Sequence, residues 1–278
     1  MSSFMLAYIP RKTPLHALCG TTKFVFFILW SVLAMITYDT RIMLIMAAVS
    51  AVVFVVSRTR FSEISFIVKF LVVFMMVNLV TIYLFEPEQG VLVYGTRTVL
   101  AEGFGRYTLT AEQLFYEFNV LLKYNMVVPV AIVLIVTTQP SEFASSLNRI
   151  GVPYTVAYAV SLTLRYIPDI QRDFRDISRA QQARGVELSR KNSFRKRLKG
   201  AAAILLPLIF SSLARIDTIS QAMELRGFGK HRKRTWYSGK PFTRTDAAVV
   251  CIGVLFFAFG AWFTFRDGNR FYNPFTGR

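Results

Sequence analysis

The sequence predicts an all-α integral membrane protein with about five transmembrane helices and long amphipathic cytoplasmic helices. Its 278 residues are 54 % hydrophobic and include 26 phenylalanines. The mean hydropathy is +0.43, which is above the usual range of a soluble domain. Long apolar stretches and a strongly basic central segment complete the pattern.

Five apolar stretches have the length of a membrane span or approach it, since the hydrocarbon core takes about 20 residues of helix. They cover residues 24–38, 42–56, 64–85, 120–137 and 247–265. The last three are long enough, whereas the first two are short and only a turn around Asp39 separates them. No small-residue cleavage site follows the first stretch, so we expect it to be retained rather than removed as a signal peptide.

The distribution of lysine and arginine predicts the orientation, because cytoplasmic loops near spans are rich in positive charge. Residues 139–246 hold 20 of the 33 basic residues and 8 acidic ones. The loop near 86–118 holds two arginines and five glutamates. We therefore expect three parts: transmembrane helices with an external loop in 1–138, a cytoplasmic region in 139–246, and a last transmembrane helix and tail in 247–278.

Three helices are predicted in the cytoplasmic region. A short helix begins at Pro140 and stops at Gly151, and a long helix runs from there to Gly185. Pro168 is expected to bend or break this long helix, because it removes a backbone donor. Another helix covers about 201–225. Its first 13 residues are uncharged, a run too short to span, which favours an interfacial or protein-covered helix.

Both long helices carry an apolar stripe at steps of three and four residues, which predicts a contact face on each. The first also carries arginines interleaved with aspartates on another face. The predicted contact-face residues are Ile170, Phe174, Ile177 and Ala180, followed by Ile216, Ile219, Ala222 and Met223.

A nine-residue pattern, Ile-Ser-x-Ala-x-x-x-Arg-Gly, occurs twice, at 177–185 and 219–227. Each arginine, Arg184 or Arg226, stands seven residues after the isoleucine and so nearly in line with the apolar stripe. One arginine followed by glycine is an ordinary helix end. Five identical residues at the same offsets in two places instead favour paired docking sites that meet an acidic or carbonyl-rich surface.

The sequence offers little for catalysis or metal binding. It has two histidines, two cysteines far apart, and no glycine-rich phosphate loop with its lysine and hydroxyl residue. We assign no catalytic, cofactor-binding or metal-binding residue. The basic cluster within 190–199 is interpreted as an anchor for anionic membrane lipid, and its context disfavours nucleic acid.

Two other classes remain open. An ion-coupled secondary transporter needs ionisable groups inside its spans, where only Lys69 and Lys123 stand, near span ends. A membrane-embedded enzyme or scaffold would depend on the loop near 86–118. The glutamates of that loop are irregularly spaced and predict solvated surface; they are Glu86, Glu88, Glu102, Glu112 and Glu117.

Four segments carry specific sequence: Thr-Thr-Gln-Pro-Ser-Glu at 137–142, Arg-Ile-Gly-Val-Pro at 149–153, Leu-Arg-Tyr-Ile-Pro at 164–168 and Ala-Gln-Gln-Ala-Arg-Gly-Val at 180–186. Together these segments resemble the transmembrane T component of energy-coupling factor transporters. In that family two crossing coupling helices end in Ala-Arg-Gly motifs that dock into two ABC-type ATPase subunits. A separate substrate-binding S component rests on the coupling helices.

Carried over by position, the resemblance assigns ATPase binding to Ala183, Arg184 and Gly185, and to Leu225, Arg226 and Gly227. Leu225 departs from the family pattern, which has a small alanine there. The resemblance further implies a multi-pass protein of a prokaryotic cell membrane that takes part in vitamin or micronutrient uptake. ATP and Mg²⁺ would bind to the partner ATPases, and this chain would bind no cofactor.

Overall fold

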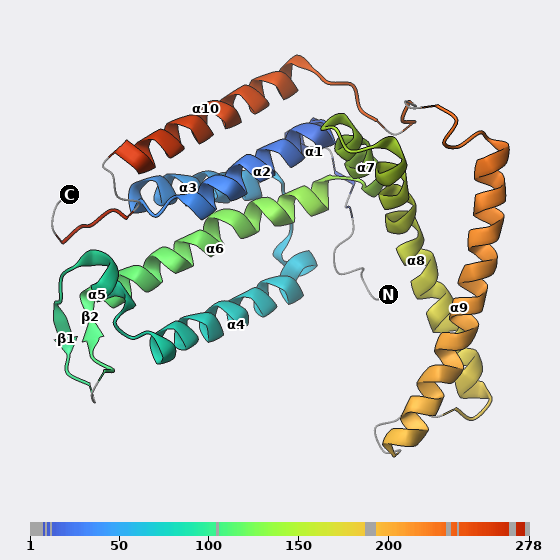
Figure 1. The fold of residues 1–278 in the computed structure, drawn as a ribbon, viewed down its shortest axis with the longest axis horizontal. Coiled ribbons are helices and arrows are strands. Elements are labelled where there is room, and N and C mark those ends of the chain that lie inside the picture. The colour runs from blue at the N-terminus through green and yellow to red at the C-terminus, as the bar shows by residue number, and fades with distance from the viewer. Residues whose placement is uncertain are drawn as a thin grey trace. The chain divides into compact units, whose positions relative to one another are not determined.

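The structure, a computed structural model, describes residues 8, 10, 11, 13–103, 106–186, 193–231, 235–237, 239–266 and 271–275. Helices dominate these residues, so the all-α prediction is confirmed (Figure 1). The chain divides into two compact units, Met1–Glu142 with Lys240–Arg278, and Phe143–Gly239.

Five long helices build the first unit, and each contains one predicted apolar stretch. They are α2 (Gly20–Ile36), α3 (Thr40–Val56), α4 (Phe61–Phe85), α6 (Ala111–Thr137) and α10 (Arg244–Arg266). By length and composition, α4, α6 and α10 can cross a membrane, whereas α2 and α3 are shorter apolar helices of 17 residues each. The smaller elements are α1 (Pro14–Ala17), α5 (Gln89–Tyr94), β1 (Val99–Ala101) and β2 (Leu109–Thr110).

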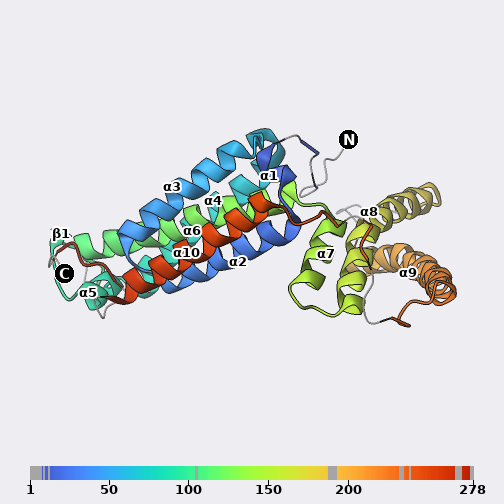
Figure 2. The ribbon, with the colours of Figure 1, turned by 90° about the horizontal axis from the view of Figure 1, so that it is seen from above.

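The core of this unit lies where α3 packs along α6 and α10 packs along α2 (Figure 2). Large buried side chains fill it, among them Trp30, Leu33, Met43 and Met46. The Trp30 indole donates a hydrogen bond of 2.9 Å to the carbonyl oxygen of Met126. This bond satisfies a polar group that would otherwise be costly to bury in an apolar bundle.

Glu112 corrects the prediction that the glutamates near 86–118 are solvated. Its side chain is fully buried in the first turn of α6, and its carboxylate accepts hydrogen bonds of 3.0 and 2.9 Å from the backbone N–H and hydroxyl of Thr98. The antiparallel pair β1–β2 comes just before this turn. The irregular spacing of the glutamates does not reveal this contact, because Thr98 lies fourteen residues before Glu112 in the sequence.

The second unit is built on α8 (Tyr154–Ala183) and α9 (Phe194–Leu225), preceded by α7 (Pro140–Arg149), which begins in the first unit. The predicted short helix and both long helices are therefore present. Pro168 does not break α8, which is continuous over 30 residues.

Helix α9 is longer than predicted. Its segment Leu198–Leu225 is long and apolar enough to cross a membrane, by length and composition. The sequence predicted a helix over about 201–225 with an uncharged run of 13 residues, too short to span, whereas α9 begins at Phe194 and its apolar segment Leu198–Leu225 extends beyond that run on both sides.

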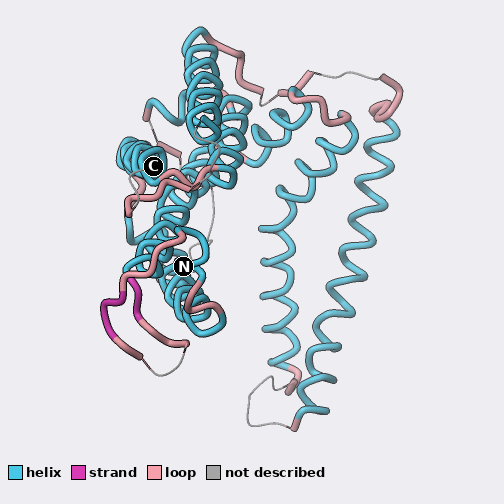
Figure 3. Tube along the Cα trace, turned by 60° about the vertical axis from the view of Figure 1, so that its left-hand side comes forward, coloured by secondary structure: helices cyan, strands magenta, loops and turns pink. Residues whose placement is uncertain are grey.

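Helices α8 and α9 run in opposite directions and cross each other (Figures 1 and 3). The C-terminal end of α8 therefore lies at one end of the pair, and the C-terminal end of α9 lies at the other.

Candidate functional site

Helix α8 ends in a Schellman motif built from the first copy of the repeated pattern. Arg184 is the C-cap, and Gly185 follows with a φ of 85°. The N–H of Gly185 donates to the carbonyl of Gln182 at 2.9 Å, and the N–H of Val186 donates to the carbonyl of Gln181 at 3.0 Å. Glycine is favoured here because most residues with a Cβ are disfavoured at positive φ.

Helix α9 ends in the same way. Arg226 is the C-cap and Gly227 has a φ of 63°. The N–H of Gly227 donates to the carbonyl of Glu224 at 2.8 Å, and the N–H of Phe228 donates to the carbonyl of Met223 at 2.9 Å. The left-handed glycine cap predicted for both copies is confirmed, so the repeated sequence forms one backbone geometry twice.

Most of the predicted ATPase-binding residues are accessible at these two ends. Ala183, Arg184 and Gly185 are exposed. Arg226 is also exposed, and Leu225 is 89 % exposed, which is unusual for a leucine. Gly227 is half-buried. The binding role itself stays a prediction.

An ion pair joins the two helices. A guanidinium nitrogen of Arg215 lies 2.6 Å from a carboxylate oxygen of Asp173. The same guanidinium stands 5.9 Å from the ring centre of Tyr166. The sequence predicted the aspartates of α8 only as part of a charge ladder. Asp173 and Arg215 are 42 residues apart, and the same offset relates the two copies of the repeated pattern. This shared offset is the sequence feature from which their pairing could have been predicted.

The predicted contact face is not covered by the second unit's own side chains. Ile170, Phe174 and Ile216 are 40, 43 and 54 % exposed. The remaining members are either exposed, as are Ala180 and Ala222, or half-buried, as are Ile177, Ile219 and Met223. The face is therefore available for lipid or for another protein.

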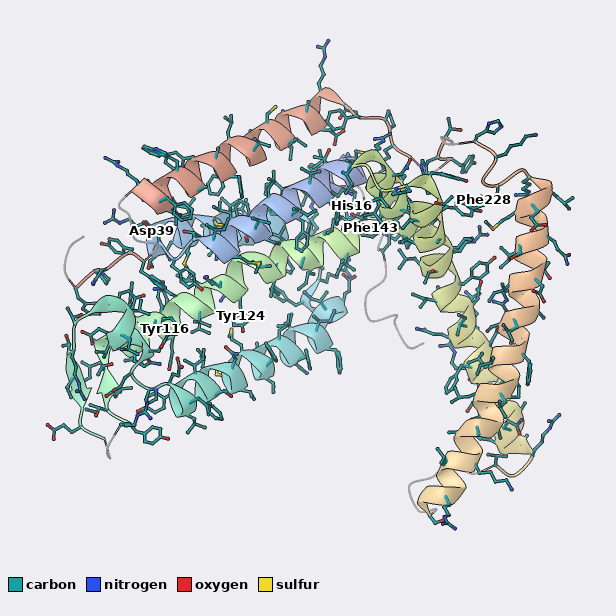
Figure 4. All side chains as sticks on the ribbon, viewed as in Figure 1. His16, Asp39, Tyr116, Tyr124, Phe143 and Phe228 are labelled. Atoms are coloured by element: carbon teal, nitrogen blue, oxygen red, sulfur yellow. The ribbon has the colours of Figure 1, made fainter. Side chains whose placement is uncertain are left out.

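An aromatic cluster, not predicted from sequence, ties the end of α9 to the start of α8. The ring of Phe228 lies 4.9 Å from that of Tyr158 and 5.5 Å from that of Tyr154, measured between centres. Figure 4 shows Phe228 between these two helix ends. Trp236 joins the cluster and donates through its indole nitrogen to the side chain of Asn148 at 3.2 Å. The Arg226 end is thus held against α8.

A buried ionic cluster lies where the chain passes between its two units, at 142/143 and 239/240. Glu142 is 2 % exposed, and its carboxylate lies 3.3 Å from the ammonium of Lys240 and 4.0 Å from that of Lys23. Lys240 also donates to the carbonyl of His16 at 2.7 Å. These contacts, all within the first unit, join the two segments at which the chain enters and leaves the second unit.

Basic residues Arg190 and Lys191 of the predicted lipid anchor lie outside the described residues. Across the ranges that the structure does describe, no group of three or more histidine, cysteine, aspartate or glutamate side chains is arranged to hold a metal ion.

Comparison with known proteins gives a consistent result. The model of the CbiQ family, described as "Cobalt transport protein", matches residues 11–237. An "Energy-coupling factor transporter transmembrane protein EcfT" of Limosilactobacillus fermentum is 32 % identical over 165 residues, which cover 55 % of this chain and 61 % of the relative. Proteins of the same name from Bacillus selenitireducens and Brevibacillus brevis are 26 and 25 % identical. The alignments cover 90 and 92 % of this chain, and 93 and 96 % of the relatives.

Proposed function

Since this chain belongs to the CbiQ cobalt transport protein family, we propose that it is the transmembrane component of an energy-coupling factor transporter. In this role it transmits the ATP-driven motion of two ABC-type ATPase subunits to a separate substrate-binding S component. The chain itself is not catalytic, and ATP and Mg²⁺ bind to the partners.

The observation that carries the proposal is the placement of two helix ends with the same backbone cap and the same Arg-Gly pair at opposite ends of a crossed pair. A pair of related ATPase subunits presents two equivalent surfaces related by an approximate two-fold axis. The C-terminal ends of α8 and α9 lie at opposite ends of the helix pair, so each end can contact one of these surfaces.

The chemistry of the ends supports binding to a carboxylate or carbonyl-rich pocket. Arginine presents five donors in a planar fork that matches such acceptors. Arg184 and Arg226 are both exposed, and each is followed by a glycine that lets another backbone approach closely. Leu225 adds an exposed apolar side chain at the second end, so the two ends differ in size.

Motion of these ends reaches the rest of the protein through rigid contacts. The aromatic cluster of Tyr154, Tyr158, Phe228 and Trp236 holds the Arg226 end to α8. The exposed apolar face on α8 and α9 holds the S component, which carries the vitamin or other micronutrient. Its tilting releases the substrate on the cytoplasmic side of a prokaryotic cell membrane, where the coupling helices lie.

Co-purification and uptake measurements test the proposal. Arg184→Ala and Arg226→Ala are each expected to weaken ATPase binding, because losing one partner of a buried charged contact costs about 2 to 5 kcal/mol. Arg172→Ala is the matched control, since Arg172 lies on α8 with a 70 % exposed side chain and pairs only with Asp169 nearby in the described chain. Unchanged ATPase binding and uptake in the double arginine variant would refute the docking role.

A further inference from the structure

Two stretches of chain link the second unit covalently to the first. One is residues 137–142, from the end of α6 into α7, and the other is residues 240–246, which leads into the first turn of α10. We call them the entry connection and the exit connection. Because they are covalent links, movement of the second unit pulls on them directly. How firmly they are held therefore decides how much of that movement reaches the transmembrane helices.

The segment 16–23, which leads into α2, holds the entry connection. The ammonium of Lys23 donates to the carbonyl oxygen of Thr137 at 2.8 Å and lies 4.0 Å from a carboxylate oxygen of Glu142. All three residues are buried. Polar contacts that are shielded from water are electrostatically stronger than those at the surface. The entry connection is therefore fixed to this segment.

The same segment holds the exit connection. The N–H of Cys19 donates to a carboxylate oxygen of Asp246 at 2.8 Å, and the ammonium of Lys240 donates to the carbonyl oxygen of His16 at 2.7 Å. Asp246 is fully buried, and its other carboxylate oxygen accepts a hydrogen bond of 2.9 Å from the N–H of Thr243. This last contact folds the exit connection onto the start of α10.

The two connections also contact each other. The ammonium of Lys240 lies 3.3 Å from a carboxylate oxygen of Glu142, and the lysine side chain is 38 % exposed while the glutamate is buried. Three segments that are far apart in the sequence, 16–23, 137–142 and 240–246, thus form a closed set of contacts in which each holds the other two. We call this set the clasp.

We propose that Lys240 is a positioning residue of the transport cycle, which together with Lys23 holds both connections to one segment. Movement of the second unit then turns the transmembrane helices and is not lost as separate movement of the two connections. Packed, ion-paired contacts pass on displacement because they have discrete arrangements and do not deform continuously. The inference rests on the proposed function, in which the ATPases move the second unit.

The test is the amount of substrate imported per ATP hydrolysed, measured on the full transporter in lipid vesicles. Uptake is followed with radioactive Co²⁺ or with radiolabelled water-soluble vitamins, according to which of them the wild type imports. Lys240→Met removes the ammonium at a partly exposed position, so the variant is expected to fold. The ratio should fall about tenfold, the usual weight of one hydrogen bond to a charged group, while the ATPases stay bound and active.

Two further variants separate the clasp from a general effect of substitution. Lys240→Arg keeps the charge and the donors, so its ratio should lie near that of the wild type. Arg244→Met is the matched control, because Arg244 is an exposed basic residue at the start of α10. A wild-type ratio in Lys240→Met would overturn the proposal, even if both rates fell together, since a merely structural loss of active protein lowers both alike. Failure of the proposed function is distinct: the wild type would then carry no ATPase.

Hydrogen exchange on the unmodified transporter covers the case in which Lys240→Met folds poorly. The clasp should stay closed throughout the cycle. Amides of 16–23 and 240–246, among them the N–H of Cys19, should therefore be as protected in the transporter trapped with ATP and vanadate as at rest. Faster exchange of both segments in the trapped state would overturn the proposal, because the contacts would then open when the second unit moves.

Discussion

Asp173 of α8 and Arg215 of α9 form an ion pair of 2.6 Å, and each stands eleven residues before the arginine that caps its helix. With a rise of about 1.5 Å per residue, Arg184 and Arg226 lie about 16 Å beyond this ion pair, toward opposite ends of the helix pair. The two capping arginines are therefore equally far from this ion pair along their helices. Under the proposed function, this spacing gives each ATPase subunit of a symmetric pair an arginine at the same distance from the contact.

Charge exchange at the crossing is the first prediction. Asp173→Arg or Arg215→Asp places two like charges together, and the double exchange restores an opposite pair. Because both side chains are about one third exposed, the coupling free energy should be small, about 0.2 to 1 kcal/mol. A double-mutant cycle on thermal unfolding measures it, and additive effects of the two single variants would contradict a direct contact.

Glycine replacement at the helix ends gives the second prediction. Gly185→Ala should destabilise the end of α8 by about 1 to 2 kcal/mol, because alanine disfavours a φ of 85°. A Cβ there meets no atom within 4 Å, so the cost is conformational and not steric. Gly185→Asn is the matched control and should recover much of the loss, since asparagine tolerates this conformation. Co-purification of the ATPases and substrate uptake are measured for each variant. If Gly185→Ala equals wild type in both measurements, the left-handed cap of α8 is not needed for function.

The third prediction concerns the buried carboxylate of Glu142. Glu142→Ala removes the carboxylate that pairs with the buried Lys23 and with the partly exposed Lys240, and loss of one partner of a buried pair costs about 3 to 5 kcal/mol. We expect lower yield and lower uptake. The exchange Glu142→Lys with Lys240→Glu should recover part of both, and no recovery would mean that the pairing is unimportant.

Glu112 provides the fourth prediction. Glu112→Ala should destabilise the protein by about 1 to 3 kcal/mol, because the N–H and hydroxyl of Thr98 lose a buried acceptor. Glu102→Ala is the control, since Glu102 is exposed in the same loop and should tolerate the change. Thermal unfolding is measured for both variants. Equal stability of Glu112→Ala and Glu102→Ala would mean that Glu112 is a solvated surface residue, as the sequence suggested, and not a structural one.

Sequence periodicity predicted the helices and their ends because these features are local. Apolar runs located each long helix of the first unit, and the repeated arginine and glycine located the two Schellman motifs. Such features depend on residues within one or two turns of each other, which a pattern records directly.

Contacts between distant segments were not predictable in the same way. The pairing of Glu142 with Lys240 and the ring contact of Phe228 with Tyr158 join residues 98 and 70 positions apart. A single sequence shows these side chains but not which partner the packing of helices brings to each. Even the buried Glu112 resembled a surface residue until the position of Thr98 was known.

Site-specific photo-crosslinking in the assembled transporter tests the central claim most directly. A photoreactive amino acid is placed at Ala183 or at Leu225, which flank the two capping arginines and are both exposed. The account predicts that each position crosslinks to a nucleotide-binding subunit and that an exposed position near the crossing, Asp217, does not. Crosslinks from both helix ends only to lipid or to this chain itself would contradict it.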